Sequence, residues 1–261
     1  MKCKICSSDT SAFGSATLLN KYDVHYYRCD HCGFVQTEAP YWLEEAYQTA
    51  VARSDVGLVR RNVTFAVVSR AIISFLFDLK AAFVDYGGGY GLFVRLMRDA
   101  GFDFYWIDKY CPNLFAKGFE AHPGSGEGRY ELLTAFEVFE HMVHPLEEIE
   151  QMLRLSKNIL FSTELIPREE PKPGEWWYYA PEDGQHISFF TLDSLAAIGK
   201  KFRMNLYSNG RTLHLLTPKK IPASLFKLIS LYPVAWVLQL FRRQPSLLER
   251  DHQGAVSRMR G

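Results

Sequence analysis

The spacing of hydrophobic residues predicts helices ahead of the centre of the chain. In residues 46–77 apolar side chains recur every three or four positions, for example at Val63, Val67, Ala71 and Phe75. This period places the side chains on one face of a helix, because an α-helix turns once in about 3.6 residues. We therefore predict one or two helices here, packed on the domain that follows.

Short apolar runs then alternate with a glycine-rich turn. Residues 81–84 form an uninterrupted apolar run, which is typical of a buried parallel strand. Glycine fills four of the five positions 87–91, a helix is predicted over 92–100, and a second strand over 102–107 leads to Asp108. Strand, glycine turn, helix, strand and acid, in this order, indicate a nucleotide-binding βαβ unit.

The spacing of these glycines distinguishes between ligands. A dinucleotide fingerprint G-x-G-x-x-G that starts at Gly87 and Gly89 needs a third glycine where Leu92 stands. The chain instead has Asp85-x-Gly87-x-Gly89-x-Gly91. Side chains at positions 87 and 89 would fill the space of a ligand that lies against the backbone. An ordinary turn is the alternative interpretation.

This arrangement resembles the first motif of the class I S-adenosylmethionine-dependent methyltransferases. The resemblance implies an α/β fold with a Rossmann-like sheet that is mostly parallel and has one antiparallel edge strand. It also implies that the glycine loop lies under the methionine end of S-adenosylmethionine and that Asp108 accepts hydrogen bonds from the ribose hydroxyls. The implied cofactor residues are Asp85, Gly87, Gly89, Gly91, Asp108 and Phe136.

The likeness to this family extends over about residues 60–218. It includes the fourth strand and its helix in 131–149 with an E-V-x-E-H stretch, the fifth strand in 158–165, a following stretch in 186–195, and two last strands in FRMNLY and TLHLLTP. Thr191 is a candidate N-cap for the helix after 186–190. The likeness is weak at the third, adenine-contacting strand near 118–121.

Composition changes this picture little. Lys and Arg number 30 and Asp and Glu 29, a net charge of +1, so no strong overall field favours nucleic acid. The first residues, MKCKICSSDT, have no apolar segment behind a basic start, so we expect a cytoplasmic protein with reduced cysteines.

Four cysteines predict a metal module. Cys3 and Cys6 form one C-x-x-C pair, and Cys29 and Cys32 form another, which together match the four thiolates of a closed structural zinc site. Gly33 would let the backbone turn so that amides point at the sulfurs. We expect a zinc-ribbon-like module over 1–40 ahead of a methyltransferase domain over 41–218. Unlinked buried thiols are the alternative.

His186 is our first candidate for the base that removes a proton from the methyl acceptor. It follows the loop PKPGEWWYYAPEDGQH, whose aromatic residues could stack on a sugar or aryl ring; the alternative is that His186 anchors this loop. A zinc module before a methyltransferase domain resembles the sugar C-methyltransferases that act on nucleotide-linked deoxysugars. Their histidine-glutamate-histidine run is reduced here to Gly184-Gln185-His186, and their long C-terminal domain is lacking, so methylation of a hydroxyl also fits.

Glu140 and His141 are the other catalytic candidates. With Glu137 they stand at i, i+3 and i+4, which would share one face of a helix. Together with His186 they could hold Mg²⁺ or Mn²⁺, as some O-methyltransferases acting on RNA ends or polyprenyl-phenols do. The simpler interpretation is that Glu140 and His141 cap and orient the helix that follows.

Residues 219–261 are predicted to form an apolar helical tail with a loose end after Gln244. Segment 221–243 is apolar on nearly all sides and is bracketed by Lys219-Lys220 and Arg242-Arg243. Three interpretations compete: helices packed on the domain, a dimer surface, and an interfacial membrane anchor. Packing on protein is the one we favour.

These observations predict an S-adenosylmethionine-dependent methyltransferase that acts on a small, sugar-like or glycan-precursor molecule at oxygen or carbon. A non-catalytic module with a methyltransferase fold, recruited through its zinc ribbon, is a different class of function. The intact Asp85, glycine loop and Asp108 argue against that alternative, and the near-zero net charge argues against an RNA substrate.

Overall fold

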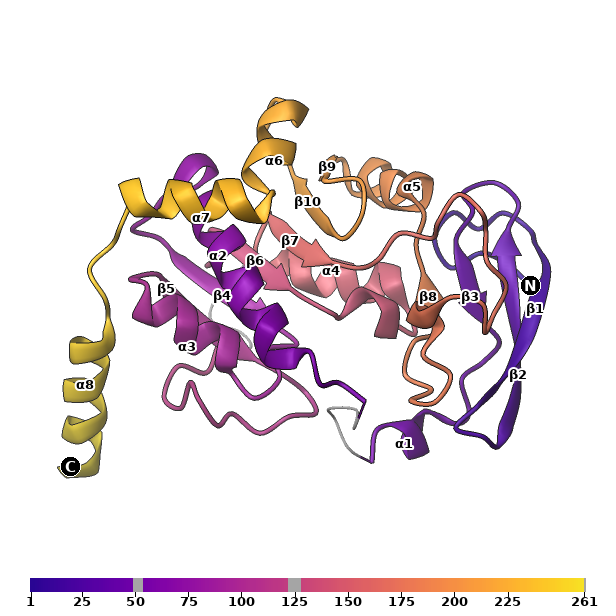
Figure 1. Cartoon of the computed structure of the whole chain (residues 1–261), viewed down its shortest axis with the longest axis horizontal. Helices are drawn as coiled ribbons and strands as arrows, with labels where there is room; N and C mark the ends of the chain where they lie inside the picture. The colour runs from indigo at the N-terminus through magenta and orange to yellow at the C-terminus, as the bar shows by residue number, and fades with distance from the viewer. Residues whose placement is uncertain (49–53, 122–127, 261) are drawn as a thin grey trace. The chain divides into compact units, whose positions relative to one another are not determined.

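The computed structural model describes residues 1–48, 54–121 and 128–260, and their strands form two sheets (Figure 1). The strands are β1 (Thr10–Leu18), β2 (Tyr22–Cys29), β3 (Val35–Thr37), β4 (Ala82–Tyr86), β5 (Asp103–Ile107), β6 (Leu132–Ala135), β7 (Ile159–Ser162), β8 (Ser188–Phe189), β9 (Asn205–Ser208) and β10 (Leu213–Thr217). The helices are α1 (Leu43–Ala46), α2 (Leu58–Leu76), α3 (Leu92–Asp99), α4 (Pro145–Leu155), α5 (Leu192–Phe202), α6 (Ala223–Ile229), α7 (Tyr232–Phe241), α8 (Leu248–Arg260) and the 3-10 turns η1 (Phe139–His141) and η2 (Trp177–Tyr179).

The larger sheet has the Rossmann-like arrangement that the sequence predicts. Its six strands are ordered β5-β4-β6-β7-β10-β9. Strand β4 pairs in parallel with both β5 and β6, whereas β9 at the edge pairs antiparallel with β10. The prediction of a mostly parallel sheet with an antiparallel part at its edge is confirmed.

By packing, the chain divides into two compact units. Unit 1 consists of Met1–Asp55, Phe136–Met152 and Leu160–Lys220, and unit 2 of Val56–Ala135, Leu153–Ile159 and Ile221–Gly261. Each unit therefore draws on segments that are far apart in the sequence. Unit 2 contains the glycine loop, and unit 1 contains the four N-terminal cysteines and His186.

The core of unit 2 explains why 81–107 folds as strand, helix and strand. Phe83 on β4 stacks on Phe104 of β5 with ring centroids 5.1 Å apart, and Phe93 of α3 meets Phe104 edge-on at 5.4 Å. Helix α2 buries Val67 and Ala71 as its period predicts, but Val63 and Phe75 remain 42% and 39% exposed. The buried stripe of α2 is therefore narrower than the sequence pattern.

Residues 118–121, where the family likeness is weak and a third strand is expected, do not form a strand among the described residues. Trp106 accepts a hydrogen bond from the Ala121 amide at 2.7 Å and donates one to the Phe119 carbonyl at 2.8 Å. Glu120 contributes only an isolated parallel bridge to Trp106. Residues 118–121 thus run beside β5 without continuing the ladder.

In unit 1 the cysteine module shares its sheet with a distant segment. The order β1-β2-β3-β8 brings Ser188–Phe189 beside β3, with Val35 opposite Phe189. Thr191 caps α5 as predicted, because its hydroxyl accepts a hydrogen bond from the Ser194 amide in a capping box. The same hydroxyl donates to the Cys32 carbonyl at 2.6 Å, so the helix cap and the cysteine module are joined directly.

The C-terminal segment differs from the prediction of a loose end. Residues after Gln244 form α8 instead, because Asp251 is 7% exposed and accepts two hydrogen bonds of 2.8 Å from the guanidinium of Arg98, which is itself 1% exposed. Gly101 (φ +93°) leaves no room for a Cβ, which would lie 2.5 Å from Gln244. Among the described residues, no single helix is long and apolar enough to cross a bilayer; the bent pair α6–α7 passes that test only when taken together.

Candidate cofactor, catalytic and metal sites

The glycine loop after β4 holds an open space at one position. Gly87, Gly89 and Gly91 have φ values of 68°, 53° and 85°, a region that favours glycine. A Cβ at Gly91 would lie 2.7 Å from Asn113 Oδ1, and one at Gly88 would lie 2.8 Å from Trp106 Cδ1, so both glycines are needed for packing. A Cβ at Gly89 would meet nothing within 4 Å. Gly89 therefore leaves room for a ligand, as the sequence interpretation requires.

Asp108 fixes the shape of this loop. Its Oδ2 accepts a hydrogen bond from the Gly89 amide at 2.9 Å, and its Oδ1 accepts from the Tyr110 and Cys111 amides at 2.7 Å each. Trp106 donates from Nε1 to the Gly89 carbonyl at 2.8 Å. A carboxylate offers about four acceptor positions, so Oδ2 retains capacity for one more donor. The ribose contact of Asp108 stays a prediction.

Asp85 is a buried acid at the start of the loop. It is 3% exposed and its Oδ1 accepts a hydrogen bond of 2.6 Å from the Thr134 hydroxyl. Burial raises the pKa of Asp85 to about 7; the Thr134 bond opposes this shift and the negative charge of Asp108 adds to it. Thr134, a polar residue within the buried strand β6, was not singled out from the sequence, although its place in the run LLTA is the signal that marks it. Phe136, directly after β6, is half-buried and its cofactor contact stays a prediction.

Three predicted catalytic residues of unit 1 lie together. The side chains of Glu140, His141 and His186 approach so that one ligand atom of each lies within 4.8 Å of the others. The two imidazole rings meet edge-on with centroids 4.8 Å apart. His141 and His186, 45 positions apart in the sequence, therefore lie side by side, and the catalytic roles of the three residues stay predictions.

Backbone carbonyls select the tautomers of both histidines. His186 Nδ1 lies 2.6 Å from the Tyr178 carbonyl, and His141 Nδ1 lies 3.1 Å from the Gln185 carbonyl and 3.1 Å from the Tyr47 hydroxyl. A carbonyl can only accept, so each Nδ1 carries the hydrogen and each Nε2 carries the lone pair. Burial, reinforced by His186, lowers the pKa of His141 to about 3, so His141 is neutral at physiological pH.

Glu140 is a fully buried acid. It is 0% exposed, and among the described residues neither carboxyl oxygen accepts a hydrogen bond of normal geometry. Burial raises its pKa well above the usual value, and the charge of Glu137 adds to this effect; the Tyr178 and Thr163 hydroxyls oppose it without reversing it. Burial therefore favours the neutral carboxylic acid over the carboxylate.

The helical Mg²⁺ site expected from Glu137, Glu140 and His141 is not formed. Glu137 lies outside the helix with φ +54°, and its carboxylate accepts a hydrogen bond of 2.6 Å from the Ser162 hydroxyl. Only Phe139–His141 are helical, as one 3-10 turn, and α4 begins later at Pro145. The remaining donors are two imidazole nitrogens and one carboxyl group, a poor match to the oxygen ligands that Mg²⁺ prefers. Among the described residues no hydrogen bond joins Glu140 or His141 to the start of α4: the Glu140 carboxyl oxygens have no partner, and His141 Nδ1 lies against the Gln185 carbonyl and the Tyr47 hydroxyl.

Most of the aromatic loop is core rather than substrate wall. Tyr178 and Tyr179 are 2% and 0% exposed and pack in one cluster with Tyr26 and Phe189. Tyr179 and Phe189 have ring centroids 4.6 Å apart. Trp177 alone of this run is largely exposed, at 70%. The loop therefore holds His186 through the Tyr178 carbonyl, and Trp177 is the ring that remains available to a ligand.

The four cysteines converge in unit 1 as a thiol cluster. Sulfur–sulfur distances are 3.7 Å for Cys3–Cys32, 3.4 Å for Cys6–Cys29 and 3.5 Å for Cys6–Cys32. A tetrahedron with Zn–S bonds of about 2.3 Å has edges of roughly 3.8 Å, so the cluster fits zinc. The Ile5 amide donates to Cys3 Sγ and the Cys32 amide to Cys29 Sγ, both at 3.4 Å.

Two details refine the prediction for this cluster. The Gly33 amide donates to the Cys29 carbonyl at 3.0 Å and not to a sulfur, and φ at Gly33 is +70°. The hydrogen bond from Cys32 lowers the pKa of the Cys3 thiol to about 5, whereas the bond to Cys3 raises that of Cys32. One thiolate is thus already favoured before any cation binds.

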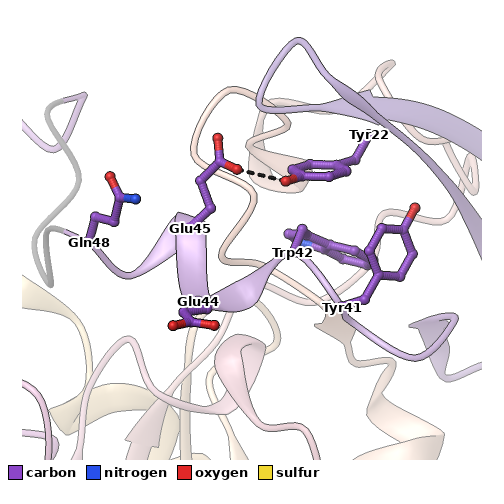
Figure 2. Close-up of a pocket in the computed structure, with 6 residues that line it drawn as sticks. All are labelled: Tyr22, Tyr41, Trp42, Glu44, Glu45 and Gln48. Carbon is purple, nitrogen blue, oxygen red and sulfur yellow. Dashed lines mark hydrogen bonds between the residues drawn. The ribbon is translucent and has the colours of Figure 1, made fainter.

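A surface hollow of about 260 Å³ in unit 1 was not anticipated (Figure 2). Its lining residues are Tyr22, Tyr41, Trp42, Glu44, Glu45 and Gln48. Figure 2 shows Glu45 directed at Tyr22, from whose hydroxyl it accepts a hydrogen bond of 2.6 Å. Lys21 also pairs with Glu45 at 2.6 Å. Because Glu45 already pairs with Lys21 and Tyr22, we assign no ligand to the hollow.

Comparison with known proteins identifies the family. A family model described as "Methyltransferase domain" matches residues 60–208. No curated protein matches the chain. Similar folds occur in TnmH (16% identity, TM-score 0.47, covering 69% of this chain and 62% of that one) and in the plantazolicin methyltransferase BpumL in complex with SAH (13%, 0.42, 68% and 89%). The magnesium protoporphyrin IX methyltransferase ChlM from Synechocystis PCC 6803 with bound SAH is also similar (14%, 0.43, 67% and 92%).

The chain thus spans 62% of the length of TnmH, and these structural likenesses are too distant to assign an acceptor. The family match covers more than half of the chain and includes the glycine loop, Asp108 and the Glu140–His141 pair. The chain belongs to the class I S-adenosylmethionine-dependent methyltransferase family.

Proposed function

We propose that the chain transfers a methyl group from S-adenosylmethionine to a hydroxyl of a small, sugar-like acceptor, with His186 as the base. The open space at Gly89, beside a loop held by Asp108, is the observation that carries the cofactor assignment. When bound, S-adenosylmethionine supplies an electrophilic methyl group on a sulfonium. The acceptor oxygen forms the new C–O bond, the C–S bond breaks, and its electron pair returns to sulfur.

The proton of the acceptor hydroxyl goes to His186 Nε2 in this proposal. The hydrogen bond from Nδ1 to the Tyr178 carbonyl keeps the lone pair on Nε2, so the ring is set to accept a proton. His141 is the weaker candidate, because burial lowers its pKa to about 3. We assign His141 and Glu140 to positioning His186. A fixed positive charge beside His186 would disfavour its protonation, whereas neutral neighbours do not.

Cofactor binding is tested first, by calorimetry with S-adenosylmethionine, S-adenosylhomocysteine and NAD. We expect heat with the first two ligands. Gly89→Val should abolish binding because the side chain enters the open space, whereas Lys201→Gln, an exposed residue of α5 in the other unit, should not change it. Removal of three amide contacts in Asp108→Ala should also weaken binding by distorting the loop. Heat with NAD alone would show that the glycine spacing was misinterpreted.

Transfer is then measured with methyl-labelled S-adenosylmethionine and three acceptor classes: nucleotide-linked deoxysugars, simple phenols and short RNA. We expect labelled sugar. His186→Ala should lower kcat by roughly 10²–10⁴-fold at unchanged cofactor affinity, and its pH–rate profile should lose the acidic limb. His252→Ala, an exposed histidine of α8, is the matched control. Binding of cofactor without transfer to any acceptor would instead favour the non-catalytic binding module.

We also propose that the cysteine cluster holds one structural zinc ion. All four thiolates would be used, which leaves no open coordination position for catalysis. The sulfur distances and the two amide donors support this assignment. Zinc would then order the β1-β2-β3-β8 sheet, because the Cys32 carbonyl is bonded to the Thr191 cap of α5.

A further inference from the structure

Helix α7 of unit 2 exposes a face made entirely of apolar side chains. The α7 outer face consists of Tyr232, Pro233, Trp236, Val237, Leu240 and Phe241. These positions repeat at i, i+1, i+4, i+5, i+8 and i+9, so they lie on one side of the helix. Trp236 is 49% and Phe241 80% exposed. The sequence alone does not show which side of this all-apolar segment is outward.

The opposite side of α7 is sufficient to hold the helix on the unit. Helix α7 packs against α2, and Figure 1 shows the two helices crossing. Ala235 is the one buried residue of α7. Leu228 and Leu231, ahead of α7, are 51% and 52% exposed and extend the apolar surface. Folding of unit 2 therefore leaves large side chains in water, which is unfavourable by about 25 cal/mol for each Å² unless another surface covers them.

Positive charge gathers at the end of this face. Residues 221–248 contain Lys227, Arg242 and Arg243 and no acid. Arg242 donates to the Ser74 carbonyl. In the described part of the chain no carboxylate forms an ion pair with any of these arginines.

The charge pattern favours an anionic bilayer over a second copy of the chain as the surface that covers this face. In a symmetric dimer the same patch meets itself, and because residues 221–248 contain no acid, the basic groups would find no acid on the partner's copy of this segment. An anionic bilayer instead offers hydrocarbon to the apolar side chains and negative headgroups to the basic ones. Trp236 and Tyr232 are residue types that favour the interface between water and lipid. The 85° bend between α6 and α7 also suits a helix that lies on a membrane better than one that crosses it.

We propose that the α7 outer face, with the exposed Arg242 and Arg243 directly after it, binds the surface of an anionic lipid bilayer. The helix lies in the plane of the interface, with Trp236 and Phe241 in the upper acyl region and the guanidinium groups at the headgroups. This goes beyond the methyl-transfer proposal and does not depend on it.

The test is co-sedimentation of the full chain with vesicles of phosphatidylcholine mixed with phosphatidylglycerol, and with phosphatidylcholine alone. We expect binding to the mixed vesicles, weakened by salt because exposed charges are screened. Arg243→Gln should lower the partition coefficient about five-fold, and Trp236→Ser by roughly ten-fold or more. Trp177→Ser, at another exposed tryptophan, and Lys201→Gln are matched controls that should bind like wild type.

Depth is measured with brominated acyl chains, which quench only a tryptophan inside the bilayer. Wild type should be quenched, whereas Trp236→Phe should still sediment with vesicles and lose the quenching. Absence of binding to the mixed vesicles overturns the proposal, as does equal binding to neutral ones. Light scattering that shows a dimer dissociated by Trp236→Ser would assign the face to a second copy and overturn it too.

Discussion

Replacing Asp85 by asparagine should stabilise the cofactor-free protein, and only where pH ionises the wild-type residue. Asp85 is 3% exposed and its pKa is raised to about 7, chiefly by burial. Asparagine has nearly the same shape, and its Oδ1 can still accept the hydrogen bond from the Thr134 hydroxyl. The substitution therefore removes a charge and leaves the packing of the loop in place.

The magnitude follows from the shift. In the unfolded chain the Asp85 pKa is about 3.9, so the folded state binds the proton more tightly and wild type loses stability as pH rises from about 4 to about 7. Three units at about 1.4 kcal/mol each set an upper limit near 4 kcal/mol. The new amide group needs acceptors, and a buried unsatisfied donor costs about 1–3 kcal/mol. We expect a net gain of roughly 1–3 kcal/mol above pH 7.

The assay is thermal unfolding of both proteins without cofactor between pH 4 and 8. For a chain of 261 residues this gain corresponds to a Tm higher by about 2–8 °C at pH 8. The gain should shrink as pH falls and should turn into a small loss near pH 4, where Asp85 is protonated and only the cost of the new amide group remains. Asp193→Asn, at an exposed acid of α5, is the control. A Tm difference that does not change with pH, or that grows toward pH 4, would refute the burial argument.

Three further predictions concern the rest of the fold. Cys29→Ser should reduce zinc from one equivalent per chain to well below one in elemental analysis, because a closed site needs all four thiolates. Asp251→Ala should destabilise the protein by about 3 kcal/mol in urea, the lower end for a broken buried pair, since Arg98 is 1% exposed and loses two hydrogen bonds but keeps its ion pair with Asp103. Burial lowers the pKa of His214 to about 4, so folding disfavours its proton: from pH 7 to pH 5 wild type should lose about 2 kcal/mol of stability relative to His214→Gln.

The sequence predicts this molecule best where local physics decides the structure. The glycine loop, the strands around it and the Thr191 cap depend on residues within a few positions of one another. The convergence of Cys3 with Cys32 is also predictable although the two residues are far apart in the sequence, because two C-x-x-C pairs together match the four ligands of one metal site. In each case the pattern in the sequence is the physical cause of the geometry.

The predictions fail where distant packing overrides the local pattern. The sequence pattern predicts Glu137 and Glu140 on one helix. In the structure Glu137 has a left-handed φ and bonds to Ser162, so it lies outside the 3-10 turn that contains Glu140. The sequence does not predict helix α8, because the contact that holds it, between Asp251 and Arg98, joins residues 153 positions apart. No periodic signal links such residues, so only the folded chain reveals them.

The protonation state of Glu140 decides whether a neutral or a negatively charged group lies beside the imidazoles of His141 and His186. Burial raises the Glu140 pKa well above its usual value and so favours the neutral carboxylic acid; glutamine reproduces the shape and the lack of charge of that form. Glu140→Gln should therefore leave stability near pH 7 almost unchanged and should keep kcat within a few-fold, whereas Glu140→Ala leaves a cavity and should cost about 2–5 kcal/mol. If Glu140 were instead ionised against His186, the glutamine variant would lose a charge-assisted contact, and the acidic limb of its pH–rate profile would move to lower pH. An unmoved limb with Gln, and loss of the limb only in His186→Ala, would leave His186 as the titrating base and Glu140 as a neutral group that positions it.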